Sequence, residues 1–189
     1  MAICFLGDIH FRADKDHFMK AYEAFLSWFA SWEENNENNH LVLAGDIVHT
    51  ANNGGIVIRY LERFLGASKF KTLHIVVGNH DKKILANKWQ VAYDFYRESE
   101  NVFIYEEETL TEVEGQKILM CPYFLGVDKN GKTMKDAYST ISERYKNLDA
   151  VVGHFGDPSS SFGDGPDCIE NLEKIFCKKV IGHIHTRVT

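Results

Sequence analysis

Histidine, aspartate and asparagine gather in five short clusters, each of which contains a glycine and follows a short apolar run. The clusters are Gly7-Asp8-Ile9-His10, Gly45-Asp46, Gly78-Asn79-His80-Asp81, Gly153-His154 and Gly182-His183-Ile184-His185. Apolar runs that end in this way are typical of buried strands. Ligands bind at the carboxyl ends of the strands in α/β sheets. We therefore expect the five clusters to converge at one edge, around Asp46.

The residue types indicate a metal centre. Carboxylate, carboxamide and imidazole ligands without cysteine suit divalent ions such as Mn²⁺, Fe²⁺ or Zn²⁺. An Asp-x-His or His-x-His pair at a strand end places both side chains on one side of the strand. One tetrahedral zinc needs fewer ligands than this sequence offers, whereas two metals about 3.5–4 Å apart with a bridging carboxylate would use them all. The candidate ligands are Asp8, His10, Asp46, Asn79, His154, His183 and His185.

Strands and helices alternate along the chain, with one hairpin in the middle. β-rich runs predict strands at Ile3–Leu6, Leu41–Ala44, Thr72–Val77, Val102–Tyr105, Thr109–Val113, Gln116–Cys121, Asp149–Val152 and Lys179–Ile181. Apolar spacing predicts helices at Asp16–Glu33, Ile56–Leu65, Ile84–Ser99, Thr133–Lys146 and Cys168–Phe176. This order predicts an α/β sandwich with mixed sheets, in one domain spanning residues 1–189.

Helix Asp16–Glu33 carries an aromatic stripe at spacings of three and four residues, which predicts a face that packs on a sheet. Its members are Phe18, Tyr22, Phe25, Phe29 and Trp32. We expect Thr133 to cap the helix that follows it.

Composition fits a globular cytoplasmic protein. The 189 residues are 44% hydrophobic and show neither a signal peptide nor a membrane span, and the four scattered cysteines suit reduced thiols. The net charge of −6 argues mildly against a nucleic-acid binder. Two bound divalent cations would, however, add four positive charges where an anionic substrate would sit.

The clusters together resemble the full motif set of the calcineurin-like metallophosphoesterases, from Asp8 to His185. The resemblance implies a four-layer sandwich of two mixed sheets flanked by helices, with two divalent ions: Mn²⁺, with Fe²⁺, Zn²⁺ or Mg²⁺ as alternatives. It implies that one metal is held by Asp8, His10, Asp46 and His185, and the other by Asp46, Asn79, His154 and His183. His80 would contact the phosphate and protonate the leaving oxygen, oriented by Asp81 or by a backbone carbonyl.

Within that superfamily the sequence is most similar to the SbcD-type repair and recombination nucleases and their counterparts in tailed phages. His49, three residues after Asp46, resembles their extra active-site histidine, which binds substrate. Protein serine/threonine phosphatases show Gly-Asp-x-Val-Asp-Arg-Gly, whereas this chain has Gly-Asp-Ile-Val-His-Thr, without the arginine. The resemblance implies DNA as substrate and a homodimer, for which we expect Tyr60, Trp89 and Tyr93 to be exposed.

Such nucleases continue past the last histidine pair into a DNA-capping region and a segment that docks an SMC-like ATPase. This sequence stops at Thr189, so we expect both regions to be absent. Two other readings stay open. A phosphodiesterase or phosphatase acting on a small substrate would suit the short length. A non-catalytic protein-binding module would predict lost ligands, and none of the motif ligands is lost.

Overall fold

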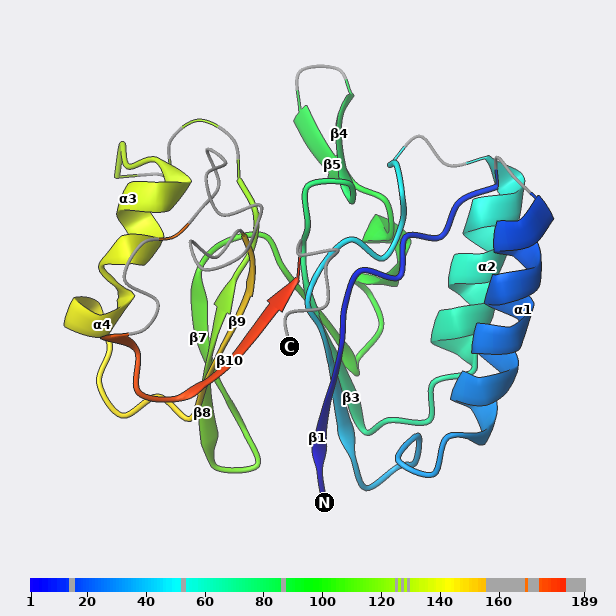
Figure 1. Ribbon diagram of the computed structural model, residues 1–189, viewed down its shortest axis with the longest axis horizontal. Coiled ribbons are helices and arrows are strands. Elements are labelled where there is room, and N and C mark those ends of the chain that lie inside the picture. The colour runs from blue at the N-terminus through cyan, green and yellow to red at the C-terminus, as the bar shows by residue number, and fades with distance from the viewer. Residues whose placement is uncertain are drawn as a thin grey trace.

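The computed structural model describes residues 1–13, 16–51, 54–85, 88–124, 126, 128, 130–155, 169 and 174–182. Two four-stranded sheets form the centre of this part of the chain (Figure 1). The first sheet is all parallel and runs β1 (Ile3–Leu6), β2 (His40–Leu43), β3 (Thr72–Val76) and β6 (Val102–Tyr105). The second runs β10 (Lys178–Gly182), β9 (Ala150–His154), β8 (Gln116–Cys121) and β7 (Thr109–Val113). Only its β7–β8 pair, the expected hairpin, is antiparallel.

Helices cover the outer face of each sheet, so the molecule has four layers (Figure 1). α1 (Asp16–Ser31) and α2 (Gly55–Gly66) lie on the first sheet, and α3 (Met134–Ser139) and α4 (Ile141–Arg144) lie on the second. This arrangement confirms the predicted mixed α/β sandwich.

Each interface between layers has its own apolar core. The predicted aromatic stripe of α1 packs between the helices and the first sheet, where Phe29 contacts Phe64 of α2 with ring centroids 4.6 Å apart. Successive residues of β2, such as Leu41 and Val42, are both fully buried although they face opposite sides of the sheet, because both faces of the sheet are covered. Val42 belongs to the core between the two sheets. Burying a side chain of this kind contributes about 1.5–3 kcal/mol to stability.

Two predicted helices differ from the observed structure. The predicted helix Ile84–Ser99 is wrong: the chain forms an antiparallel pair, β4 (Lys82–Leu85) and β5 (Lys88–Val91), followed by the single turn η1 (Asp94–Tyr96). The predicted helix Thr133–Lys146 is divided at Thr140 into α3 and α4. Its predicted cap is confirmed, because the Thr133 side chain accepts the backbone N–H of Asp136. The predicted helix Cys168–Phe176 lies mostly outside the described residues.

Candidate metal centre

The loops that follow β1 and β2 are joined along their length by backbone hydrogen bonds. The N–H groups of Asp8 and His10 donate to the carbonyls of Gly45 and Asp46, at 3.1 and 2.9 Å. Asp8 and His10 each have positive φ, at 53° and 51°, so neither is in the extended conformation that we expected for this pair. Their side chains nevertheless meet, with His10 Nε2 3.8 Å from Asp8 Oδ1. The convergence comes from two left-handed turns and not from strand alternation.

Asp46 is the centre of the site. Its side chain is fully buried, and its Oδ2 lies 3.2 Å from Nε2 of His154, 3.5 Å from Nε2 of His10 and 3.9 Å from Nε2 of His80. Burial alone raises the pKa of Asp46, but His154 and then His80 outweigh it, and the pKa is lowered. Asp46 therefore presents a carboxylate to imidazoles from three separate segments.

The hydrogen bonds of His154 favour a cation in this cluster. Its Nδ1 donates to the carbonyl of Ala44 at 2.8 Å, so in the neutral imidazole Nε2 carries a lone pair. That lone pair faces Asn79 Oδ1 at 3.0 Å and Asp46 Oδ2 at 3.2 Å. Asp46 Oδ2 is buried and accepts no hydrogen bond within the part of the chain that the structure describes. Three electron-pair donors pointing at one another suit a divalent metal, so these residues fit the metal centre expected from the sequence.

A proton would also satisfy this geometry in the metal-free protein. Burial alone lowers the pKa of His154, but the adjacent Asp46 carboxylate reverses the effect and the pKa is raised. Either cation, proton or metal, offsets the carboxylate of Asp46.

Gly45 and Gly78 are positions of the site that require glycine. Gly45 has φ of +85°, and a Cβ there would overlap the ring of His154. A Cβ on Gly78 would overlap the carboxylate of Asp46. Any larger residue at either position would push apart the segments that carry the candidate ligands.

His80 lies at the rim of the site, with 37% of its side chain exposed. Its Nδ1 donates to the backbone carbonyl of His49 at 2.6 Å, which directs Nε2 toward Asp46. The sequence left open whether Asp81 or a backbone carbonyl orients His80. In the structure this group is the backbone carbonyl of His49. The ring of His49 stacks on that of His80, with centroids 5.2 Å apart and planes 17° apart. His10 also belongs to this group of three neighbouring imidazoles.

Asp81 has a different role, which the sequence did not indicate. Its buried carboxylate accepts the backbone N–H groups of Asp46 (2.8 Å), Gly78 (2.9 Å) and Val48 (3.2 Å), and the hydroxyl of Tyr93 (3.1 Å). Burial first, and then the charge of Asp46, raise the pKa of Asp81 to about 6. No sequence signal distinguished this carboxylate from a ligand or from an exposed acid.

Five of the seven candidate ligands lie in this cluster: Asp8, His10, Asp46, Asn79 and His154. The other two, His183 and His185, lie outside the described residues. The strand that precedes them is described, and its last residue, Gly182, pairs with His154 in the parallel register of β9 and β10.

The expected exposed aromatic surface is wrong for two of its three residues. Tyr60 is 7% exposed and Tyr93 is fully buried, so both belong to the core between the helices and the first sheet. The side chain of Trp89 lies outside the described part of the structure.

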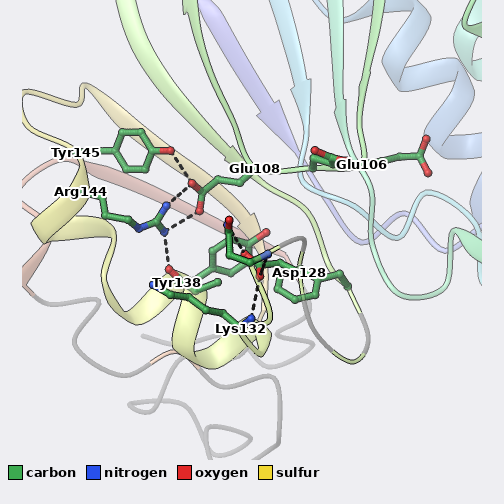
Figure 2. Close-up of a pocket in the computed structure, with 11 residues that line it drawn as sticks. Glu106, Glu108, Asp128, Lys132, Tyr138, Arg144 and Tyr145 are labelled. Carbon is green, nitrogen blue, oxygen red and sulfur yellow. Dashed lines mark hydrogen bonds and ion pairs between the residues drawn. The ribbon is translucent and has the colours of Figure 1, made fainter.

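A cavity of about 470 Å³ opens near the segments that follow β6 and β8. Figure 2 shows that several of its polar side chains are engaged with one another: the carboxylate of Glu108 pairs with Arg144 and accepts the hydroxyl of Tyr145. Acidic side chains outnumber basic ones on its walls, which are formed by Glu106, Glu107, Glu108, Phe124, Asp128, Asn130, Lys132, Ala137, Tyr138, Arg144 and Tyr145.

The four-layer sandwich, with aspartate, asparagine and histidine at its strand ends, fits a metal-dependent phosphoester hydrolase. The family model of the calcineurin-like phosphoesterases matches residues 1–187, and the chain belongs to this family. The family typically uses two divalent metal ions.

Among solved structures, the chain is similar to a protein of unknown function from Aquifex aeolicus. The two share 17% sequence identity over 96% of this chain and 89% of the other, with a TM-score of 0.48. No curated protein matches the sequence. Within the described residues, no helix combines the length and the apolar character needed to cross a bilayer.

Proposed function

We propose that this chain is a metal-dependent nuclease that hydrolyses phosphodiester bonds in DNA. The observation that carries the proposal is the convergence of three histidine Nε2 atoms on the buried Oδ2 of Asp46. Asp8, His10 and Asp46 would hold one metal, and Asp46, Asn79 and His154 would contribute to the other. The same proposal assigns His185 to the first metal and His183 to the second.

When bound, two divalent ions activate water and neutralise the charge that develops on the phosphoryl oxygens. Asp46 would be a ligand of both ions. His80 has the position of an acid: its Nδ1–H is anchored to the His49 carbonyl, and its partly exposed ring faces the cluster through Nε2. Protonated on Nε2, it would give that proton to the departing oxygen.

His49 supports DNA as the substrate. Its ring lies against that of His80, so the part of a DNA strand next to a phosphate bound at His80 would lie within reach of His49. We therefore assign His49 to substrate binding, beside the scissile phosphate.

A small phosphodiester is the second candidate, and the charge distribution favours it. The chain carries a net charge of −6, and the cavity in Figure 2 is lined by three consecutive glutamates, Glu106, Glu107 and Glu108. These follow β6 directly, at the carboxyl edge that β6 shares with β1, β2 and β3. A net negative charge of this size would repel an extended polyanion more than a compact monoanion.

Assays of one preparation with added Mn²⁺ separate the two candidates. The substrates are a single-stranded oligonucleotide, labelled at either end, and bis-p-nitrophenyl phosphate. The nuclease proposal expects cleavage of both, and the label pattern then distinguishes exonuclease from endonuclease action. Hydrolysis of the small diester with the oligonucleotide left intact would overturn the nuclease and leave the small-substrate phosphodiesterase.

Partners beyond the substrate remain proposals. A homodimer would have to use a surface other than Tyr60 and Tyr93, because both side chains are buried. The SMC-like ATPase partner is proposed from the resemblance of the motifs to the SbcD-type nucleases, and the cytoplasmic location from the composition of the sequence.

A further inference from the structure

We propose that Asp81 and Tyr93 act as a positioning pair that holds the two central ligand-bearing loops of the metal site in register. The proposal rests on the metal-dependent hydrolysis proposed above and assigns two residues to which the reaction gives no direct role. Neither side chain has to touch a metal ion or the substrate. They fix the positions of Asp46, Asn79 and His80.

The first observation is the number of hydrogen bonds on the Asp81 carboxylate. Oδ2 accepts the N–H groups of Asp46 and Gly78, and Oδ1 accepts the N–H of Val48. Two of these donors lie in the loop after β2, and the third lies in the loop after β3. One side chain therefore ties together the two loops that supply Asp46 and Asn79.

A reciprocal bond locks the same two loops from the other side. Asp46 Oδ1 accepts the backbone N–H of His80 at 2.9 Å, while the backbone N–H of Asp46 donates to Asp81. Asp46 has φ of 50°, a left-handed conformation that a non-glycine residue keeps only where its surroundings impose it. The bond from Asp46 N–H to Asp81 is one of the contacts that impose it.

Tyr93 completes the anchor. It is fully buried, and its hydroxyl donates to Asp81 Oδ2 at 3.1 Å. It lies just past β5, where the β4–β5 hairpin returns to the body, and the neighbouring Ala92 N–H donates to the Asp81 carbonyl at 2.9 Å. Four donors in fixed positions match an ionised carboxylate, which accepts hydrogen bonds only. The hydroxyl thus restrains the carboxylate that in turn restrains both loops.

The pair can be tested by removing only the hydroxyl, in Tyr93→Phe, which keeps the buried ring. The matched control is Tyr138→Phe, because Tyr138 is equally buried and donates its hydroxyl to the Pro122 carbonyl at 2.7 Å in the other half of the molecule. Mn²⁺ binding is measured by calorimetry on metal-free protein, together with the melting temperature without metal. Groups that orient metal ligands typically contribute 10- to 100-fold to metal affinity.

We expect the melting temperature to fall by a similar amount in both variants, whereas only Tyr93→Phe binds Mn²⁺ about 10-fold more weakly than wild type. Asp81→Asn, which places an amide N–H₂ among four donors, should weaken Mn²⁺ binding further; if it fails to fold, Tyr93→Phe decides the question by itself. Mn²⁺ affinity of Tyr93→Phe within twofold of wild type, or an equal loss in Tyr138→Phe, would overturn the proposal. Because the readout is binding of Mn²⁺ alone, a protein that binds Mn²⁺ but cleaves no DNA would refute the nuclease and leave this inference standing.

Discussion

Asp46 and Asp81 each hold the chain segment of the other: the N–H of Asp46 donates to the Asp81 carboxylate, and the Asp46 carboxylate accepts the N–H of His80. Both side chains are fully buried, so two carboxylates share a region with little water. The charge of Asp46 helps to raise the pKa of Asp81 to about 6. A bound divalent cation would relieve this repulsion, which makes the free energy of unfolding depend on metal.

Removing the metal should therefore lower stability. At a Mn²⁺ concentration 100-fold above its Kd, each site contributes about 2.7 kcal/mol to the free energy of unfolding, which corresponds to a rise of about 5–10 °C in melting temperature. Thermal melts of chelator-treated protein, with and without added Mn²⁺, measure the rise. Mg²⁺ and Zn²⁺ titrated in the same way rank the metals. A melting temperature indifferent to every divalent ion would contradict the assigned metal centre.

Asp46→Asn should abolish hydrolysis, because Oδ2 is the one oxygen on which three imidazoles converge. We expect the rate with bis-p-nitrophenyl phosphate to fall by about 100-fold or more, with an unchanged circular dichroism spectrum. Glu112→Gln, which neutralises an exposed carboxylate on β7, is the control for charge alone and should keep the wild-type rate. Activity of Asp46→Asn near that of the control would show that Asp46 is not shared between metals.

The role of His80 as an acid predicts that its removal matters most for poor leaving groups. His80→Ala should slow cleavage of a thymidine dinucleotide by about 10²–10⁴-fold, because an alkoxide must be protonated as it departs. The loss should be much smaller with bis-p-nitrophenyl phosphate, since nitrophenolate leaves without a proton. Equal losses on both substrates would assign His80 to binding and not to proton transfer.

His49 should matter more for DNA than for a small diester, because we assign it to a phosphate contact beside His80. His49→Ala is expected to raise KM for an oligonucleotide while changing KM for bis-p-nitrophenyl phosphate little. His17→Ala, at an exposed position of α1, serves as the control. If His49→Ala affects both substrates alike, His49 carries no specificity for DNA.

His74, which lies near His40, predicts how the free energy of unfolding depends on pH. His74 is buried between the sheets, where its Nε2 and Nδ1 bond to Thr72 and Tyr105, and burial with the nearby His40 lowers its pKa to about 4. Between pH 6.5 and 4 the unfolded chain binds a proton that the folded chain excludes, so stability falls as pH falls. The loss reaches about 3 kcal/mol below pH 4.

Urea unfolding at several pH values, in wild type and His74→Gln with metal chelated, isolates this effect. The histidines of the metal site titrate in both proteins, so only the difference between the two curves reports on His74. We expect the variant to be less stable at pH 7 and to lose less stability on acidification. Parallel curves would show that His74 does not exclude the proton.

The strand ends could be predicted from the sequence because each element there follows a local rule. The run ending at Gly45-Asp46 is apolar on both faces, as in a sheet covered on both sides, and the stripe through Phe29 has helical spacing. The hairpin at Glu114-Gly115 was also correct, and both residues have the positive φ that such a turn requires. These parts needed no knowledge of the tertiary structure.

The region of the β4–β5 hairpin could not be predicted in this way. Apolar residues between Lys82 and Tyr96 fit helical spacing, yet the observed pairing of Lys82 with Val91 and the bond from Ala92 to Asp81 depend on the packing around Asp81. The anchoring role of Asp81 has the same origin, since its four donors come from positions 46, 48, 78 and 93. A carboxylate that binds backbone groups distant in the chain leaves no pattern in the sequence around it.

The β4–β5 hairpin leaves the body at Asp81 and rejoins it at Ala92, and one backbone bond closes that base. Figure 1 shows it projecting beyond the ends of the strands of the two main sheets. A change in its length or sequence beyond the Lys82–Val91 pair would leave the anchor of the metal loops in place. The hairpin is thus a position that could vary in length and sequence, or be exchanged by grafting, without rebuilding the metal centre.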